Sequence, residues 1–290
     1  MRDRQSRTQI LFPVEFTAVR RVERQKSRLR QLVNLSPGFR PRMPQTEGIP
    51  QPSRKTSPWK GIQVGITGVR GSLGQALAQR FQEAGAEVTG LTHGEPASSP
   101  TGPIKHWLSW RCGQEHQLEP QLRKLDLLVL NHGVNPQGDQ SVEALDTALE
   151  VNALSVWRLL RICEQLARDG TGPREVWVNT SEAEIQPAVS PAYEVSKRLI
   201  GQLVSIRGAV RSEQDRSRLL SRKLVLGPFR SKLNPIGVMN ADFVANQILY
   251  QAGLGARLIV VTPNPLIFVL MPLSELARWL YYRVLNRHDR

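Results

Sequence analysis

From residue 61 onward, short apolar runs alternate with longer segments in which apolar residues recur every three or four positions. The short runs have the length of strands, and the recurring spacing is that of one helix face. Strands separated by crossover helices are typical of a parallel sheet that is covered on both faces. The pattern therefore predicts a doubly wound α/β domain with a parallel sheet over residues 61–262. The expected strands are 62–66, 87–91, 125–130, 175–178, 223–226 and 257–261, and the expected helices are 73–83, 142–167 and 192–206.

Residues 1–60 differ from this domain in composition and charge. They hold 14 of the 39 Lys and Arg residues against four acidic residues, so they carry +10 of the chain's net charge of +14. Residues 36–60 are a mixture of Pro, Ser, Arg and Gln that buries too little apolar surface to offset its ordering entropy. We expect a basic, Pro-rich, largely disordered tail. Apolar residues at 19, 22, 29 and 33 leave two interpretations of its first half, a basic helix that contacts a membrane or RNA and a solvated segment.

Residues 263–290 form an apolar C-terminal extension. Leu273, Leu276, Leu280 and Val284 keep one side of an expected helix apolar, with Trp, Tyr and Arg residues beside them. One interpretation is a helix that closes the substrate pocket or forms a dimer seam. The other is a helix at a membrane surface, because aromatic residues with nearby arginines suit the headgroup layer. No stretch of the chain reaches the roughly 20 apolar residues of a membrane span.

The cysteines and histidines argue against metal or disulfide chemistry. Cys112 and Cys163 are the only cysteines, too few for a disulfide framework or a four-ligand zinc site. The five histidines are scattered, so no metal site is expected. We expect a cytoplasmic protein in a reducing compartment, with contact at the cytoplasmic face of the membrane as the alternative.

A glycine-rich turn follows the first expected strand and precedes a helix. Glycines at positions 68, 71 and 74 permit a tight turn, close approach of the backbone to a pyrophosphate, and close packing of helix on strand. The helix N-terminus adds N–H groups and partial positive charge. In this strand–turn–helix context the turn predicts dinucleotide binding, that is, a Rossmann fold. The expected cofactor-binding residues of this turn are Gly68, Arg70, Gly71, Ser72, Leu73 and Gly74.

The end of the second expected strand bears on which dinucleotide binds. An enzyme that uses NAD carries Asp or Glu there to accept from the ribose 2′-hydroxyl. Here the strand ends in Thr92, His93 and Gly94, with no carboxylate at the tip. Arg70 can pair with a 2′-phosphate, and Thr92 and His93 can donate hydrogen bonds to it. NADP(H) is therefore favoured over NAD(H), the alternative for Arg70 being a solvated surface charge.

Side chains suited to proton transfer gather at the expected carboxyl edge of the sheet. Tyr193 and Lys197 are four positions apart on one helix face, so the ammonium can lie beside the phenol and lower its pKa. Ser181 ends the strand before this helix. Residues 131–133 end the preceding strand at the same edge, where open α/β sheets place their active sites, and Asn152 lies in the helix that follows.

In the order and approximate spacing of these residues, the chain resembles the short-chain dehydrogenase/reductase family. The resemblance implies that Tyr193 is the general acid/base, that Ser181 hydrogen-bonds the substrate oxygen, and that Lys197 contacts the nicotinamide ribose. It also implies that Asn152 holds a water for proton relay. The resemblance adds these cofactor-binding residues: Asn131, His132, Gly133, Tyr193, Lys197 and Ser231.

Residues 176–184 and 226–235 resemble, more narrowly, the reductase module of bacterial sterol desaturase/short-chain dehydrogenase fusion proteins. The chain departs from the wider family at His132, where Ala is usual, and in having one residue fewer between Ser181 and Tyr193. The glycine spacing is that of the family's extended and atypical members.

The sequence therefore predicts an NADPH-dependent oxidoreductase that reduces a carbonyl, or oxidises an alcohol, on a hydrophobic and lipid-like substrate. The alternative is an NADP(H)-binding sensor or scaffold without turnover. The expected partners are a small hydrophobic substrate and a second copy of the chain, with the membrane surface as the alternative. Nucleic acid is not an expected partner, because the basic tail contains no recognised reading module.

Overall fold

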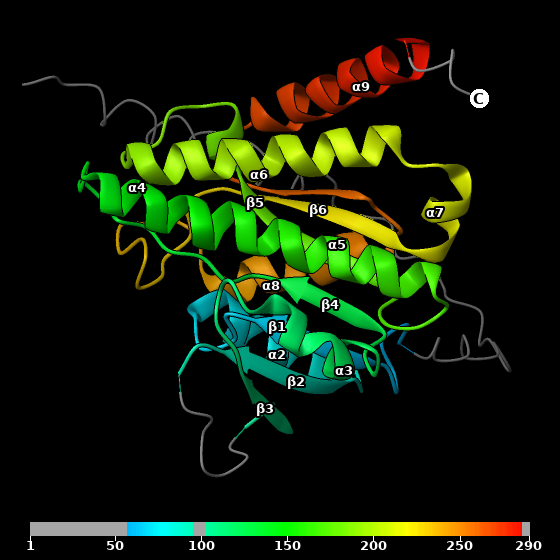
Figure 1. Ribbon diagram of the computed structural model, residues 1–290. Coiled ribbons are helices and arrows are strands. Elements are labelled where there is room, and N and C mark those ends of the chain that lie inside the picture. The colour runs from blue at the N-terminus through cyan, green and yellow to red at the C-terminus, as the bar shows by residue number, and fades with distance from the viewer. Residues whose placement is uncertain (1–56, 95–101, 286–290) are drawn as a thin grey trace, which may run out of the picture. The chain divides into compact units, whose positions relative to one another are not determined.

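A computed structural model describes residues 57–94 and 102–285, which fold around one parallel sheet (Figure 1). The seven strands lie in the order β3-β2-β1-β4-β5-β6-β7, and every neighbouring pair is parallel. The chain moves outward from β1 to one side and then returns to build the other side, so the order reverses between β1 and β4. Ligands of open α/β sheets bind at this reversal, beyond the carboxyl ends of the strands. The strands are β1 (Gln63–Thr67), β2 (Glu87–Thr92), β3 (His106–Ser109), β4 (Leu127–Leu130), β5 (Glu175–Ser181), β6 (Leu220–Leu226) and β7 (Leu258–Val261).

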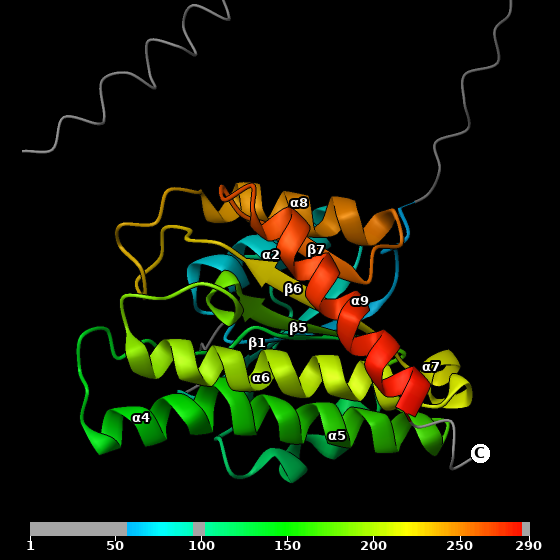
Figure 2. The same cartoon turned by 90° about the horizontal axis from the view of Figure 1, so that it is seen from above.

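Helices cover both faces of the sheet, as expected for a doubly wound domain (Figures 1 and 2). On one face α2 (Ser72–Glu83) and α8 (Ala241–Gly253) pack side by side over a core that includes Ile66 and Val261. The other face carries a second core beneath α5 and α6. The remaining helical elements are η1 (Glu115–Leu118), α3 (Glu119–Leu122), α4 (Val142–Leu149), η2 (Glu150–Leu154), α5 (Ser155–Arg168), η3 (Glu182–Glu184), α6 (Pro191–Val210), α7 (Glu213–Arg218) and α9 (Ile267–Leu285).

The structure departs from the expected elements in several places, among them β3 and α8, which were not expected. Strand β3 is an edge strand of four half-buried or exposed residues, too short and too polar to give a clear apolar run. Strand β5 continues three residues beyond the expected end and reaches Ser181. The helix expected over 142–167 is interrupted by the π-helical turn η2, which contains Asn152. The spacing of apolar residues does not predict such an interruption, because the helices on both sides of η2 keep their buried faces.

Residues 57–60, which the sequence analysis assigned to the tail, are part of the described domain. Trp59 is only 9% exposed and contacts Phe81 and Trp177 edge-on, with ring centroids 5.6 and 5.5 Å away. Trp59 thus closes the core beneath β1 and α2. The predictions for residues 1–56 lie outside the described residues.

The C-terminal helix α9 lies across the outer side of α6 (Figures 1 and 2). Its first turns pack through Ile267 and Met271 on Val225 and Val260 of the sheet. The predicted apolar face is present and points away from the domain, since Leu273, Leu276, Leu280 and Val284 are all exposed. Of the helices in the described part of the chain, none has the length and apolar character needed to cross a membrane.

The position of Trp59 predicts the N-terminal limit of the folding unit. A chain that starts at Ser57 should unfold cooperatively, and Trp59→Ala within it should lower the free energy of unfolding by about 3–5 kcal/mol, because an indole cavity opens in the core. Phe243→Ala, which removes an aromatic ring that is half exposed on α8, is the control and should cost less than about 1 kcal/mol. Denaturant unfolding measures both. Equal losses would show that Trp59 does not support the core.

Candidate active site

The turn after β1 has the backbone that its glycines permit. Gly68 has a φ of +62°, and a Cβ there would lie 2.7 Å from the Cα of His132. A Cβ on Gly74 would lie 2.5 Å from the carbonyl oxygen of Gly68. Both contacts are with backbone atoms that cannot move aside, so these positions require glycine.

The start of α2 is open to an anion. Its N-cap residue, Gly71, provides no side chain to cap the helix, and the first turn contains no acidic residue. The first N–H groups of a helix have no partner within the helix and carry partial positive charge. The uncapped helix end and the close-packed glycine turn fit the pyrophosphate of a dinucleotide.

The side chains expected to recognise the adenosine ribose meet at the end of β2. Arg70 lies against Gly94, where its Nη1 would be 2.9 Å from an added Cβ, and its guanidinium is 5.6 Å from the centroid of Trp107. His93 stacks on Trp110 with ring centroids 4.8 Å apart. Thr92 is buried, and its hydroxyl accepts a bond from the Gly94 amide. Arg70 therefore brings a guanidinium to this end of the strand, and the residues Thr92–Gly94 include no carboxylate.

His132 lies beneath the glycine turn and is almost completely buried. Its Nδ1 is 2.8 Å from the hydroxyl of Thr67. Burial lowers the pKa of His132 from 6.5 to about 3, so the imidazole is neutral at physiological pH. The side chain therefore supports the turn from below, and the cofactor contact of His132 implied by the resemblance stays a prediction.

A chain of hydrogen bonds leads from the glycine turn to the catalytic side chains. The hydroxyl of Thr67 accepts from the Asn131 amide at 2.9 Å, and the Oδ1 of Asn131 accepts from Asn179 at 2.9 Å. The carbonyl oxygen of Asn179 in turn accepts from Nζ of Lys197 at 3.1 Å. This chain fixes the ammonium of Lys197 relative to the phosphate-binding turn.

Ser181, Tyr193 and Lys197 come together at the carboxyl edge, as expected. Ser181 ends β5 and hydrogen-bonds the phenol of Tyr193, which lies in the first turn of α6. The Nζ of Lys197 is 5.8 Å from the Tyr193 ring centroid. Burial lowers the pKa of Lys197 to about 8, which leaves it largely cationic at neutral pH.

The pKa of Tyr193 moves in the opposite direction from the one expected. The neighbouring ammonium was expected to lower this pKa, whereas burial raises the pKa of the phenol and outweighs the hydrogen bond from Ser181. The nearby Glu182 carboxylate raises it further. Tyr193 is therefore protonated at neutral pH and suited to give a proton.

The side chain of Asn152 is fully occupied by protein partners. Its Oδ1 accepts from the amide of Val134 at 2.8 Å, while its Nδ2 donates to the Val134 carbonyl and to the hydroxyl of Ser196, both at 2.9 Å. Ser196 donates to the carbonyl oxygen of Tyr193 at 2.8 Å. In this arrangement Asn152 positions the loop after β4 and the start of α6. The water-holding role implied by the resemblance stays a prediction.

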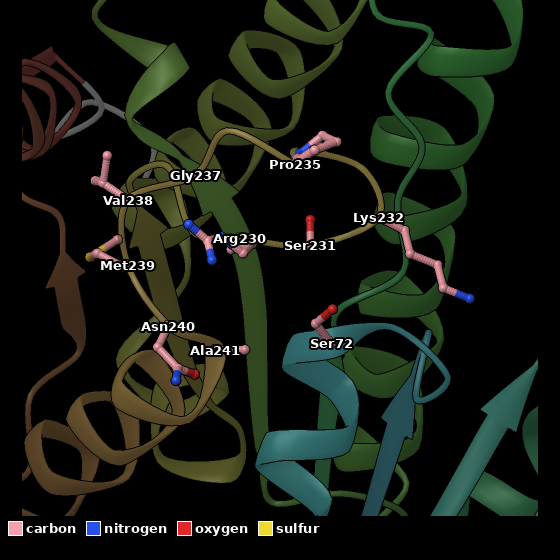
Figure 3. Close-up of a pocket in the computed structure, with 10 residues that line it drawn as sticks. All are labelled: Ser72, Arg230, Ser231, Lys232, Pro235, Gly237, Val238, Met239, Asn240 and Ala241. Atoms are coloured by element: carbon pink, nitrogen blue, oxygen red, sulfur yellow. The ribbon is translucent and has the colours of Figure 1, made fainter.

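Ser231 lines a cleft of about 710 Å³ between the start of α2 and the loop after β6 (Figure 3). Figure 3 shows Ser72 on the helix side and Ser231 with Arg230 and Lys232 on the loop side. Asn135, from the loop after β4, donates to the Leu233 carbonyl at 3.2 Å. Two loops that are far apart in sequence therefore meet over the carboxyl edge, next to the glycine turn.

Sequence reasoning missed a polar group that adjoins Tyr193. Glu182 is buried, and its carboxylate accepts from Thr262 and Gln186. Gln186 also accepts from the side-chain amide of Asn264 at 2.7 Å. Glu182 directly follows Ser181, which was the available signal, but Thr262 and Asn264 come from the far end of the domain. Within residues 57–94 and 102–285, no cluster of three or more His, Cys, Asp or Glu could hold a metal ion.

Residues 64–203 match the family model described as the NAD dependent epimerase/dehydratase family. The chain is also 39% identical over 235 residues to the monoglucosyldiacylglycerol epimerase of Synechocystis sp. (strain ATCC 27184 / PCC 6803 / Kazusa). That alignment covers 79% of this chain and 56% of the relative, so the chain spans little more than half of the relative's length. A link to sterol desaturase fusion proteins stays a prediction.

Solved structures share the fold at low sequence identity. A short-chain dehydrogenase from Sphingobium yanoikuyae in complex with NADPH superposes with a TM-score of 0.61 at 17% identity, covering 79% of this chain and 98% of that one. A short-chain dehydrogenase from Burkholderia cenocepacia in complex with NADP gives 0.63 at 18% identity, covering 79% and 99%. These likenesses show the fold, and the family model and the Synechocystis relative support an NAD(P)-dependent enzyme of the epimerase/dehydratase class.

The buried, neutral His132 predicts a pH dependence of stability. Its pKa is lowered on folding, so between pH 6.5 and about 3 the unfolded chain binds a proton that the folded chain does not. Stability should therefore fall as the pH falls through this window, by up to about 1.4 kcal/mol per pH unit. His132→Asn should lose less stability than the wild type between pH 7 and pH 4.5 in urea unfolding. His116→Asn, at an exposed position, is the control and should follow the wild type.

Proposed function

We propose that this chain is an NAD(P)-dependent oxidoreductase module that epimerises a hydroxyl-bearing carbon in the sugar headgroup of a glycolipid. Two observations support the proposal. The Ser181, Tyr193 and Lys197 side chains form one proton-transfer group at the carboxyl edge, and the chain resembles a monoglucosyldiacylglycerol epimerase over most of its length. The contact between the Ser181 and Tyr193 side chains carries the argument, because it brings a proton donor and a hydrogen-bonding hydroxyl to one substrate oxygen.

The nicotinamide cofactor, when bound, accepts a hydride from the sugar carbon and returns it. Tyr193 is protonated in the free site, so it must first release its own proton to solvent; it would then accept the substrate hydroxyl proton as the alcohol is oxidised to a ketone. Ser181 would hydrogen-bond the ketone oxygen. Tyr193 would return the proton to this oxygen when the ketone is reduced, and inversion requires that the sugar ring first turn its other face toward the cofactor. Atoms and electrons balance without a net oxidant, and the cationic Lys197 favours the deprotonated form of the phenol in the first half of the cycle.

Glu182, Gln186 and Asn264 are suited to hold a sugar ring beside Tyr193. A carboxylate accepts hydrogen bonds from sugar hydroxyls, and side-chain amides both donate and accept them. Burial raises the pKa of Glu182, so a further hydrogen bond from a substrate hydroxyl would stabilise its carboxylate. A simple hydrophobic ketone, the substrate class expected from the sequence, has no hydroxyl to give this hydrogen bond.

The cofactor preference rests on Arg70. We expect the protein to bind NADPH about tenfold or more tightly than NADH, because a guanidinium and no carboxylate faces the ribose at Thr92–Gly94. Arg70→Ala should narrow this preference by about 1–3 kcal/mol, the range for hydrogen bonds to charged groups. Titration of each nucleotide into wild type and variant measures it. Equal wild-type affinities would contradict the electrostatic argument.

Product analysis tests the proposed reaction. The protein should convert glucosyl diacylglycerol in mixed micelles into an epimeric hexosyl lipid, with cofactor supplied well below the amount of substrate and no reduced cofactor accumulating. Tyr193→Phe should lower turnover by about 10²- to 10⁴-fold, because it removes the proton carrier while keeping the ring. Nucleotide affinity and melting temperature should stay close to those of the wild type.

Other outcomes point to the other functions. Stoichiometric oxidation of NADPH with reduction of a hydrophobic ketone, and no epimer, would identify the carbonyl reductase expected from the sequence. Tight nucleotide binding with no turnover of either substrate class would identify the sensor or scaffold. A Tyr193→Phe variant as fast as the wild type would overturn the assignment of the proton carrier.

A further inference from the structure

The rotation of α9 about its axis is fixed by a buried ionic cluster. Lys223, on β6, contacts Glu184 at 2.6 Å and Glu275 of α9 at 2.8 Å. The hydroxyl of Ser205, on α6, also donates to Glu275 at 2.5 Å. The ammonium and the Glu184 carboxylate are almost completely buried, so detaching Glu275 would leave a buried cluster without one of its partners. The inner face of α9 is thereby determined by Ile267, Met271 and Glu275.

With this rotation, an apolar stripe runs along the opposite side of α9. Val269, Leu273, Leu276, Leu280 and Val284 follow one another at intervals of three or four residues, and each is 46–63% exposed. At 1.5 Å per residue the stripe is about 22 Å long. In both overall views no element of the described chain lies over it (Figures 1 and 2). Apolar residues scattered singly over a protein surface do not form a continuous stripe of this length. The stripe therefore indicates an interaction surface.

The residues beside the stripe favour a lipid surface as its partner. Arg283 is exposed and lies over the ring of Trp279, 4.8 Å from its centroid. Tyr281 is exposed on the other flank. Glu275 is the one acidic residue of α9, and it faces inward. The outer face therefore offers a guanidinium and amphipathic rings without a carboxylate, which matches anionic phosphates better than the same face of a second copy.

The stripe begins beside the candidate active site. Asn264, three residues before α9, bonds to Gln186 of the polar group that adjoins Tyr193. Leu266 and Phe268 are exposed where the helix begins, and the loop after Gln186 exposes Val189. A lipid whose acyl chains stay in the bilayer could thus present its headgroup at the end of α9 nearest the polar group.

We propose that the outer face of α9 docks on the surface of an anionic lipid bilayer and brings the active site to a membrane-embedded substrate. The docking is inferred from the geometry of α9 alone. The delivery of substrate to the active site also depends on the proposed function.

Vesicle sedimentation with the full chain tests the docking. Vesicles of phosphatidylcholine with phosphatidylglycerol are used at 0.5 M salt, which screens binding through the basic N-terminal residues more than apolar insertion. The wild type should bind, and the double variant Leu276→Ser/Leu280→Ser should bind at least tenfold more weakly. Leu254→Ser, at an exposed leucine following α8, is the matched control and should bind like the wild type. Melting temperatures should agree among all three.

Equal vesicle binding by the wild type and the double variant would overturn the proposal. So would a wild-type dimer in lipid-free sedimentation velocity that the double variant converts to monomers with vesicle binding unchanged, because α9 would then be a contact between copies.

Turnover separates this inference from the proposed function. The double variant should lose activity on glucosyl lipid in vesicles relative to activity on a dispersed short-chain analogue. If neither substrate is converted while vesicle binding depends on α9, the proposed function fails and the docking stands. If both substrates are converted and the ratio of the two activities is unchanged by the double variant, α9 does not deliver the substrate.

Discussion

The hydroxyl of Thr67 is the point on which the candidate site depends. It is buried at the end of β1, where it meets the amides of Asn131 and His132 and the ring of His132. These bonds join β1 to β4 at the place where the strand order reverses, and Asn131 passes the connection on to Asn179 and Lys197. The glycine turn and the Lys197 ammonium therefore belong to one hydrogen-bonded unit. Under the proposed function, this unit would fix the position of a bound cofactor relative to Tyr193.

Burial gives the titratable groups of the site different protonation states at neutral pH. His132 is kept neutral and supports the turn, Lys197 stays largely cationic, and Tyr193 keeps its proton at neutral pH. One cation beside one phenol is enough for a reaction that takes a proton and returns it. Under the proposed function, the polar group formed by Glu182 and its neighbours supplies hydrogen-bonding partners for the hydroxyls of a sugar headgroup.

The sequence was sufficient for the parts of the structure that rest on local chemistry. Buried strands gave apolar runs, glycine spacing gave the turn, and the interval from Tyr193 to Lys197 placed both on one helix. Sequence reasoning failed where tertiary contacts decide. The short edge strand β3 lacks an apolar run, the net pKa direction of Tyr193 follows from burial rather than from its helical neighbour, and the partners of Asn152 become visible only when β4 and α6 meet. The hydrogen bonds of Thr262 with Glu182 and of Asn264 with Gln186 join positions 80 and 78 residues apart, which no local pattern predicts.

The attachment of α9 through Glu275 also limits how this helix can change in evolution. Substitutions along the outer stripe leave the packing of the helix on the domain unchanged. Insertion of a single residue between Met271 and Glu275 is different, because it would turn everything beyond it by about 100° relative to the packed first turns. Either the buried contact with Lys223 is lost or the outer stripe is turned away from its present direction. Homologous chains should therefore keep constant the number of residues between β7 and the anchoring glutamate.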